Sequence, residues 1–376
     1  PARAAGVRIV TNMGAANPLG AADRVRSLAV ELGLSPPKIA VVLGDDLIET
    51  MDEAQIRAAQ TLEGTSLGGR PLIAANAYLG ARPVAAALAT GAEIVLVGRT
   101  TDAALTLGPL IHEFGWGAAD WDLLAAGTIA GHLLECGGQV TGCYFADPGR
   151  KDVPDLARAG FPIAEVSAEG AVTITKPEGT GGLVSPATVT EQLLYEMHDP
   201  ARYLTPDVVA DISEVSLAHG APDRVSLAGV RGHPAPPTLK ATICVENGWL
   251  AEAEISYAGP GALARARLAG EVVVERLALL GVAEPPRIDI IGAHSVLSGG
   301  QAQPAAPDGD YRLRAALRAQ VKAPAQALAD EVLALYCSGP AGGGGVRAAV
   351  TPQLATASIL VPRGPVESRT RVEVLR

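Results

Sequence analysis

The fold is decided by an apolar run that passes directly into polar residues, at positions 94–102 with the sequence IVLVGRTTD. The first four residues are continuously apolar, which is typical of a strand that is covered on both faces of a parallel sheet. The turn after them carries Arg99 and Asp102, and a helical pattern follows over 102–112. A strand, a polar turn and a helix in this order predict part of a βαβ unit.

The same alternation surrounds this segment. Three more apolar runs have the length of strands, at 7–11, 39–43 and 72–75. Helical patterns lie beside them at 19–32, 52–62 and 82–90. Residues 1–160 are therefore expected to form a Rossmann-like domain on a parallel sheet. Because the pattern starts abruptly, we expect this domain to lack its N-terminal unit, a helix and strand upstream of Val7.

The pattern changes near residue 160. Before this boundary, a strand is predicted at 140–145. After it, strands are predicted at 172–175, 225–228, 239–245, 251–257, 358–361 and 371–375. The dipeptide Asn247-Gly248 predicts a hairpin between the strands at 239–245 and 251–257. Helices are predicted over 262–280 and as a pair within 310–335. The chain is thus expected to be an α/β protein in which an α+β lobe, 161–376, follows the parallel domain. A self-association face in a homo-oligomer and ordinary core packing explain helix 262–280 equally well.

Composition excludes several classes of partner. The net charge is −10 and no basic cluster is present, so nucleic acid is not expected to bind. No apolar run approaches the roughly 18–20 residues of a membrane-spanning helix, so no membrane partner is expected. The four cysteines include no CxxC pair and fit reduced thiols in the cytoplasm.

Polar side chains follow all four early strands. In chain order these residues are Asn12, Asp45, Asp46, Asn76, Tyr78, Arg99 and Asp102. Ligands of open parallel sheets bind beyond the carboxyl ends of the strands, so a shared site is expected there. Each Asp or Asn alone is equally explained as a cap of the next helix.

Roles for these residues follow from their chemistry. Asn12, Asn76, Tyr78 and Arg99 are expected to bind substrate, since the guanidinium suits a carboxylate or phosphate. Asp102 fits a base, a metal ligand or an ion-pair partner of Arg99. Asp45 and Asp46 offer hard oxygen ligands for Mg²⁺ or Mn²⁺, although no cofactor follows from the sequence.

A second group of residues lies in the segment GHLLECGGQ, at 131–139. On a helix, His132, Glu135 and Cys136 share one face, because they are three and four residues apart. An imidazole, a carboxylate and a thiol together suit general acid–base or nucleophilic catalysis. Alternatively, Cys136 is buried and serves only as a small apolar side chain in the core.

Two glycine-rich stretches complete the candidate site. TKPEGTGG, at 175–182, places Lys176 and Thr180 beside the flexible backbone of Gly181, and the second stretch, 338–347, ends in Arg347. Consecutive backbone N–H groups can bind anions, so these residues are expected to contact substrate. Tight turns are the alternative, because neither stretch has the spacing of a nucleotide-binding loop.

These segments together resemble the acyclic terpene utilisation (AtuA) family. The similar stretches cover nearly the whole chain: 7–18 (VRIVTNMGAANP), 75–80 (ANAYLG), 110–116 (LIHEFGW), 127–142 (GTIAGHLLECGGQVTG), 144–160 (YFADPGRKDVPDLARAG), 161–166 (FPIAEV), 175–182 (TKPEGTGG) and 256–259 (SYAG). Family members normally carry a further N-terminal βα region, and some carry a C-terminal ferredoxin-like domain. The resemblance implies breakdown of acyclic terpenes such as citronellol and geraniol, through a branched 3-hydroxyglutaryl-CoA-like thioester.

Three functions remain open at this point. The first is a lyase that acts on a branched hydroxyacyl-CoA or a related carboxylic acid, with Asp102 or His132 as base. Arg99 would bind a substrate carboxylate, and Glu135 and Cys136 would donate or orient a proton. The second is a thioester or ester hydrolase that uses the same pocket, and the third is a non-catalytic partner subunit.

Overall fold

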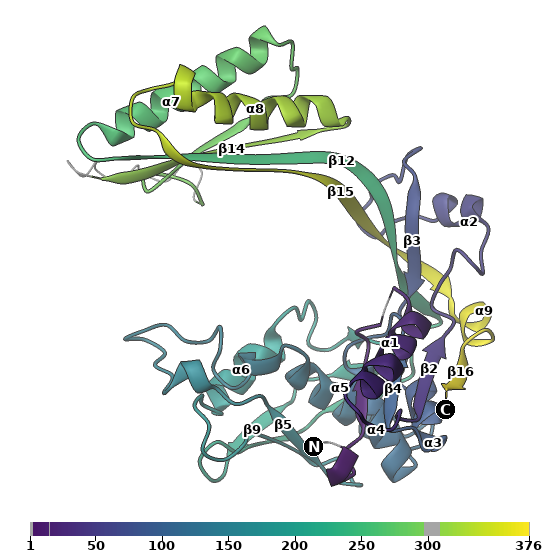
Figure 1. Ribbon diagram of the computed structural model, residues 1–376. Coiled ribbons are helices and arrows are strands. Elements are labelled where there is room, and N and C mark those ends of the chain that lie inside the picture. The colour runs from purple at the N-terminus through teal and green to yellow at the C-terminus, as the bar shows by residue number, and fades with distance from the viewer. Residues whose placement is uncertain (1–2, 15, 297–308, 376) are drawn as a thin grey trace. The chain divides into compact units, whose positions relative to one another are not determined.

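The computed structural model describes residues 3–14, 16–296 and 309–375, which form two compact units (Figure 1). The first comprises Pro1–Ser66, Ala74–Ile243 and Ala357–Arg376, and the second comprises Leu67–Ile73 and Cys244–Thr356. This division differs from the expected one at residue 160. The physical reason is that two long strands, β12 (Thr238–Ala258) and β15 (Gly344–Pro362), each carry the chain from one unit into the other.

The first unit is built on a four-stranded sheet of order β1-β4-β2-β16. Strands β1 (Ile9–Thr11), β4 (Ile94–Val97) and β2 (Ile39–Leu43) are parallel, and β16 (Arg371–Leu375) runs antiparallel to β2. The continuous apolar runs are buried, as expected for central strands. Helices α1 (Pro18–Glu31) and α3 (Arg82–Ala89) pack on this sheet. The predicted α/β class is confirmed.

The third predicted strand does not join this sheet. Strand β3 (Leu72–Ala77) pairs with β12 instead, and its residues alternate between more and less buried positions. Its carboxyl end still lies beside β2 and β4. The Ala77 backbone N–H donates to the Asp45 carbonyl over 2.8 Å, and the Leu79 N–H donates to the Arg99 carbonyl over 3.2 Å.

A helical layer covers the site end of the first unit. Helix α4 (Ala104–Phe114) packs against α5 (Trp121–Glu135), which is buried from Leu124 to Leu133. The two helices approach closely because Gly131 has no side chain. A Cβ atom at this position would lie 2.7 Å from the Cα of Ala103. This contact brings the last turn of α5 to the turn that carries Asp102.

The other elements of the first unit are short. They comprise α2 (Glu53–Ala58), α6 (Pro186–Leu194), α9 (Arg363–Glu367), β5 (Ile163–Val166), β6 (Val172–Thr175), β7 (Tyr203–Leu204), β8 (Val209–Asp211), β9 (Ser216–His219), β10 (Val225–Ala228) and β11 (Arg231–His233). The strands form two antiparallel sheets, β5-β6-β10-β9 and β11-β8-β7. The strand predicted at 140–145 is absent. Turns follow a short 3₁₀ helix there, and Tyr144 has a φ of +62° that interrupts extended backbone.

The second unit is an antiparallel sheet with two helices on one face, α7 (Ala262–Leu279) and α8 (Lys322–Ser338) (Figure 1). The sheet contains β13 (Arg287–Ile291), β14 (Asp310–Ala319), β12 and β15. Residues 310–319 were expected to be helical and are a strand, because buried and less buried residues alternate along them. The hairpin predicted at Asn247-Gly248 is absent too, since β12 continues through it with Gly248 at a φ of +75°. Within the described residues, no helix is long and apolar enough to cross a membrane.

Candidate functional site

Asp45 ties together the ends of three strands. Its carboxylate is 5% exposed, and its Oδ2 accepts hydrogen bonds from the Arg99 backbone N–H over 2.7 Å and from Asn76 Nδ2 over 3.0 Å. Burial raises the pKa of Asp45, and these two hydrogen bonds oppose the rise. Gly98 makes room for the carboxylate, because a Cβ there would lie 2.1 Å from Asp45 Oδ1. Asp45 therefore links the ends of β2, β3 and β4 through its hydrogen bonds with Asn76 and Arg99.

The neighbouring Asp46 is used locally. Its Oδ1 accepts the backbone N–H of Ile48 over 2.8 Å, which is the geometry of an Asx turn. Among the residues that the structure describes, no three His, Cys, Asp or Glu side chains gather as metal ligands. The hydrogen bonds recorded for the two carboxylates come from backbone N–H groups and from the Asn76 amide, and a role for Asp45 and Asp46 in binding Mg²⁺ or Mn²⁺ stays a prediction.

Arg99 and Tyr78 form a cationic surface. The Arg99 guanidinium lies 5.3 Å from the centre of the Tyr78 ring, and Lys240 Nζ lies 5.4 Å from the same ring. The Tyr78 hydroxyl accepts a hydrogen bond from Thr242 over 3.3 Å. The Arg99 side chain makes no hydrogen bond or ion pair with any described residue, so its N–H groups remain available. Two cations on one aromatic ring suit an anionic substrate group.

Asp102 and Asn12 meet at the ends of β4 and β1. Asn12 Nδ2 donates to Asp102 Oδ1 over 3.0 Å, and Asp102 is exposed. Neither residue caps a helix through its side chain: Asn17 caps α1, and Ala103 precedes α4. The capping explanation therefore fails for this pair, and Asp102 keeps one carboxylate oxygen for another partner.

His132 is buried and fully engaged. It is 2% exposed, and its Nδ1 lies 2.9 Å from Glu135 Oε1 while its Nε2 lies 3.2 Å from the Leu193 carbonyl oxygen. Its ring packs against that of Tyr203, with 5.4 Å between the ring centres. A neutral imidazole has one N–H and can donate to only one of these acceptors. His132 is therefore placed to orient Glu135, and it has no nitrogen free for a substrate.

Cys136 lies in a group of acidic side chains. Burial raises the pKa of its thiol, and the nearby carboxylates of Glu135, Glu196 and Asp102 raise it further. A hydrogen bond with the buried Gln192 acts in the opposite direction. The thiol form is thus favoured over the nucleophilic thiolate, so Cys136 suits proton donation better than covalent attack.

Tyr203 and Glu196 belong to the same group and were missed by the sequence analysis. Burial raises the pKa of the Tyr203 phenol far above its ordinary value, and Glu135, Asp102 and Glu196 add to the rise. Glu196 has a φ of +56°, which is strained for a residue with a side chain. No local pattern identifies either residue, because they follow α6, far along the chain from Asp102.

In the first glycine-rich stretch, 175–182, the polar side chains of Lys176 and Thr180 are engaged within the first unit. Lys176 is buried, and its Nζ lies 3.1 Å from Asp223 Oδ2 and 2.9 Å from the Thr180 carbonyl. The Thr180 hydroxyl donates to the Pro177 carbonyl over 2.6 Å. Gly181 is required because a Cβ there would lie 1.9 Å from a backbone oxygen. The turn explanation therefore accounts for Lys176, Thr180 and Gly181.

Arg347 belongs to the second unit. It is exposed on β15, whereas the other candidate residues lie in the first unit. The first unit thus brings together two of the predicted groups, the cationic surface of Arg99 and the acid–base group of Asp102, Glu135 and Cys136. Carboxylates, a thiol and a phenol can transfer protons, and a guanidinium can bind an anion.

Comparison with family models finds a match to the family described as acyclic terpene utilisation family protein AtuA, over residues 1–372. Comparison with curated proteins and with solved structures finds no match. The family model covers almost all of the 376 residues, including both groups of candidate residues. The chain therefore belongs to the acyclic terpene utilisation (AtuA) family, and this membership supports a role in acyclic terpene utilisation.

Proposed function

We propose that the protein is a lyase that cleaves a carbon–carbon bond in a branched 3-hydroxyacyl thioester or a related carboxylic acid. The observation that carries this proposal is the acid–base group of Asp102, Glu135, Cys136 and Tyr203. Such a cleavage needs a base for the hydroxyl proton and an acid for the departing carbanion, and both kinds of side chain are present there.

The chemical step balances without a redox cofactor. A carboxylate removes the proton from the substrate hydroxyl, and the O–H electron pair forms a carbonyl as the carbon–carbon bond breaks. The electrons of that bond pass to the departing acyl fragment as an enolate, which then takes a proton on carbon. The products are a ketone and a shorter acyl compound, and no atom is oxidised by an outside reagent.

The residues take distinct parts in this step. Asp102 is the base, because it is exposed and only one hydrogen bond from Asn12 is recorded for its carboxylate. The Tyr203 phenol is the proton donor, because it is protonated at neutral pH and packs against the ring of His132, which contacts Glu135. Arg99 binds the substrate carboxylate or a phosphate of the CoA group. His132 is a positioning residue that holds Glu135, which replaces the expectation that His132 itself acts as base.

The test uses purified protein and a panel of CoA thioesters of branched 3-hydroxy acids, with the products identified by mass spectrometry. A ketone with acetyl-CoA or acetate supports the lyase. A free hydroxy acid with CoA indicates the hydrolase instead, and no turnover of any thioester, with or without Mg²⁺ or Mn²⁺, counts against an enzyme.

Variants then assign the roles. Asp102→Asn is expected to lower kcat by about 10²–10⁴-fold, the usual contribution of a general base. Arg99→Gln should raise KM more than it lowers kcat, because it removes a binding contact. Arg150→Gln is the matched control, since that arginine is exposed and lies outside both groups. An Asp102→Asn variant with full activity would exclude Asp102 as the base.

A further inference from the structure

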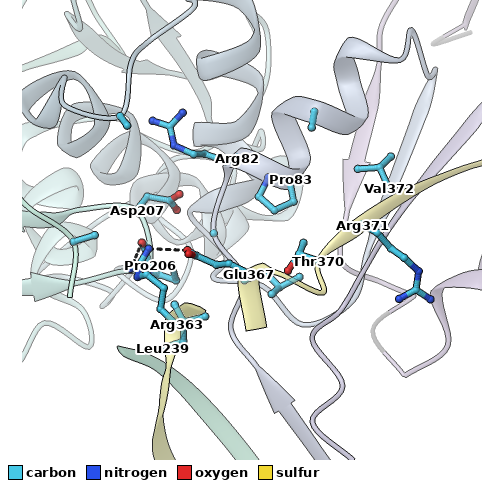
Figure 2. A pocket seen from close by; sticks show the side chains of 15 residues that line it. Arg82, Pro83, Pro206, Asp207, Leu239, Arg363, Glu367, Thr370, Arg371 and Val372 are labelled. Carbon is cyan, nitrogen blue, oxygen red and sulfur yellow. Dashed lines mark hydrogen bonds and ion pairs between the residues drawn. The ribbon is translucent and has the colours of Figure 1, made fainter. Parts of the chain in front are cut away.

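A separate cavity of about 500 Å³ lies within the first unit (Figure 2). Its volume is within the range of small-molecule sites, which is roughly 300–1,000 Å³. Six parts of the chain build its wall: the segment before α3, the first part of α3, Ala118, residues 206–207, residues 235–239, and α9 with the start of β16. Convergence of such distant segments is typical of a formed pocket rather than of a surface crease.

The position of the cavity in the fold favours a ligand site. Arg371, which lines it, pairs with Leu43 at the carboxyl end of β2. Ligands of open α/β sheets bind at this edge. Leu79 also lines the cavity, and its N–H donates to the Arg99 carbonyl. None of the side chains assigned to the proposed reaction lines the cavity, so it is a distinct site.

Most of the charged groups in the cavity wall are already paired. Arg363 donates to the Pro206 carbonyl over 2.6 Å and to Glu367 over 2.8 Å (Figure 2). It also donates to the Pro236 carbonyl over 3.0 Å. Arg371 donates to Glu373 over 3.0 Å. Arg82 differs, because its side chain makes no hydrogen bond or ion pair in the described part of the chain. Its five N–H donors are therefore available to a ligand.

The carboxyl group beside Arg82 is Asp207. Both of its oxygens lie 2.9 Å from the Ala81 backbone nitrogen, and Gly80 leaves room for them. Burial raises the pKa of Asp207 to about 6. The Ala81 N–H and the charges of Arg82 and Arg363 act against the rise, and Glu367 adds to it. Asp207 can therefore take up or release a proton near neutral pH.

The rest of the wall is largely apolar. It includes the side chains of Leu79, Pro83, Ala86, Leu239 and Val372. A guanidinium at one side of an apolar wall suits a ligand with one anionic end and a hydrocarbon body. A neutral ligand would leave Arg82 unused, and a cationic ligand would be repelled by it.

We propose that this cavity binds a small organic carboxylate with an apolar body, that Arg82 pairs with the carboxylate, and that Asp207 takes up a proton when the ligand binds. The proton is needed because the ligand carboxylate and the Asp207 carboxylate would otherwise repel each other. Once protonated, Asp207 can donate a hydrogen bond to the ligand in place of that repulsion. Binding is thus stronger at lower pH, as long as the ligand itself stays ionised.

The test measures the binding of octanoate to the whole protein by isothermal titration calorimetry at pH 6.0 and pH 7.5. Octanoate is ionised at both values, whereas Asp207 loses its proton between them. The dissociation constant is expected to rise about 15-fold from pH 6.0 to pH 7.5, because the protonated fraction of Asp207 falls by about that factor. Octanamide has the same hydrocarbon body without the charge, and it is expected to bind at least tenfold more weakly than octanoate at pH 6.0.

Variants locate the ligand. Arg82→Gln should abolish measurable octanoate binding, and Arg82 is exposed, so the fold should not depend on it. Asp207→Asn should keep binding and remove its pH dependence, since Asn retains an acceptor for the Ala81 N–H. Arg150→Gln should bind octanoate like the unchanged protein.

Three results would overturn the proposal. They are no octanoate binding at either pH, equal binding of octanamide and octanoate, or unchanged octanoate binding by Arg82→Gln. Since the readout is binding and not turnover, each of these outcomes leaves the proposed lyase activity standing. Failure of the thioester assay in turn leaves the cavity proposal standing.

Discussion

Replacement of Asp207 by Asn is expected to stabilise the protein at neutral pH and not in acid. Asp207 ionises at an ordinary pKa of 3.8 when the chain is unfolded and at about 6 when it is folded. At about 1.4 kcal/mol for each pKa unit, the difference corresponds to about 3 kcal/mol. This value is an upper bound, because the residue keeps some exposure at the cavity wall and solvent screens the charge.

The sign follows from proton binding. The folded state holds a proton on Asp207 over the pH range in which the unfolded chain has lost it. The stabilising contribution is therefore complete below about pH 4 and is lost as the pH rises through about 6. Asn carries no charge at any pH, so the variant does not undergo this loss.

Urea unfolding at pH 4.0, 5.0, 6.0 and 7.5 measures the effect on both proteins. The unfolding free energy of Asp207→Asn, relative to that of the unchanged protein, should increase by about 1–3 kcal/mol between pH 4.0 and pH 7.5. The upper limit of this range is the figure of about 3 kcal/mol derived above. The difference at pH 4.0 serves as the internal control, since it contains only the effect of the amide itself. A difference that stays constant with pH, or that shrinks, would refute the assignment of a raised pKa to Asp207.

Two further substitutions and one thiol-reactivity measurement test other features of the protein. Gly98→Ala should lower the unfolding free energy by about 3 kcal/mol in urea, because its Cβ would displace the Asp45 carboxylate. Glu196→Gly should raise it by about 0.5–1 kcal/mol in the same assay, since glycine adopts the φ of +56° without strain. With Ellman's reagent at pH 7.5, the exposed Cys337 should react at least about tenfold faster than Cys136, whose thiol pKa is raised by burial.

Each of these changes has a matched comparison. Gly69→Ala should leave stability nearly unchanged, because nothing lies within 4 Å of a Cβ at that glycine. A loss of stability equal to that of Gly98→Ala would show that the clash with Asp45 is not the cause. A Glu196→Gly protein that is less stable than the unchanged protein would disprove the backbone strain at Glu196. The Cys337→Ser variant should lack the thiol that reacts fastest with Ellman's reagent.

Much of the fold was predictable from local patterns. The strands at 39–43, 94–97, 172–175, 225–228 and 371–375 have the predicted bounds, because each is a short apolar or alternating run between turn residues. The helix expected at 262–280 ends one residue earlier. In such segments, the secondary structure that the local sequence favours is the same as the one that the tertiary contacts require.

The errors arose where tertiary pairing opposed local preference. Residues 310–319 are rich in Ala, Arg and Leu, which favour helices, but their buried face has the period of a strand. Asn247-Gly248 has the composition of a hairpin turn, yet Gly248 lies against the Ala319 backbone within a continuous strand. Long-range pairing decided both cases, and no local window of sequence contains it.

The candidate site shows the same limit. Polar residues after strands correctly indicated the cluster around Asp45 and the pair of Asn12 with Asp102. Burial was not visible in the sequence, so the engaged state of His132 could not be foreseen. Tyr203 and Asp207 follow no strand of the parallel sheet and carry no motif, and only the folded chain shows their surroundings.

The pairing of β16 with β2 has a consequence for biosynthesis. β2 ends at Leu43 and β16 begins at Arg371, so a ribosome must translate all of the residues between them before β2 gains its antiparallel neighbour. Until then the nascent N-terminal part presents a free strand edge, which is a template for pairing with other chains. Yield in a heterologous host should therefore depend on how well chaperones shield the emerging polypeptide.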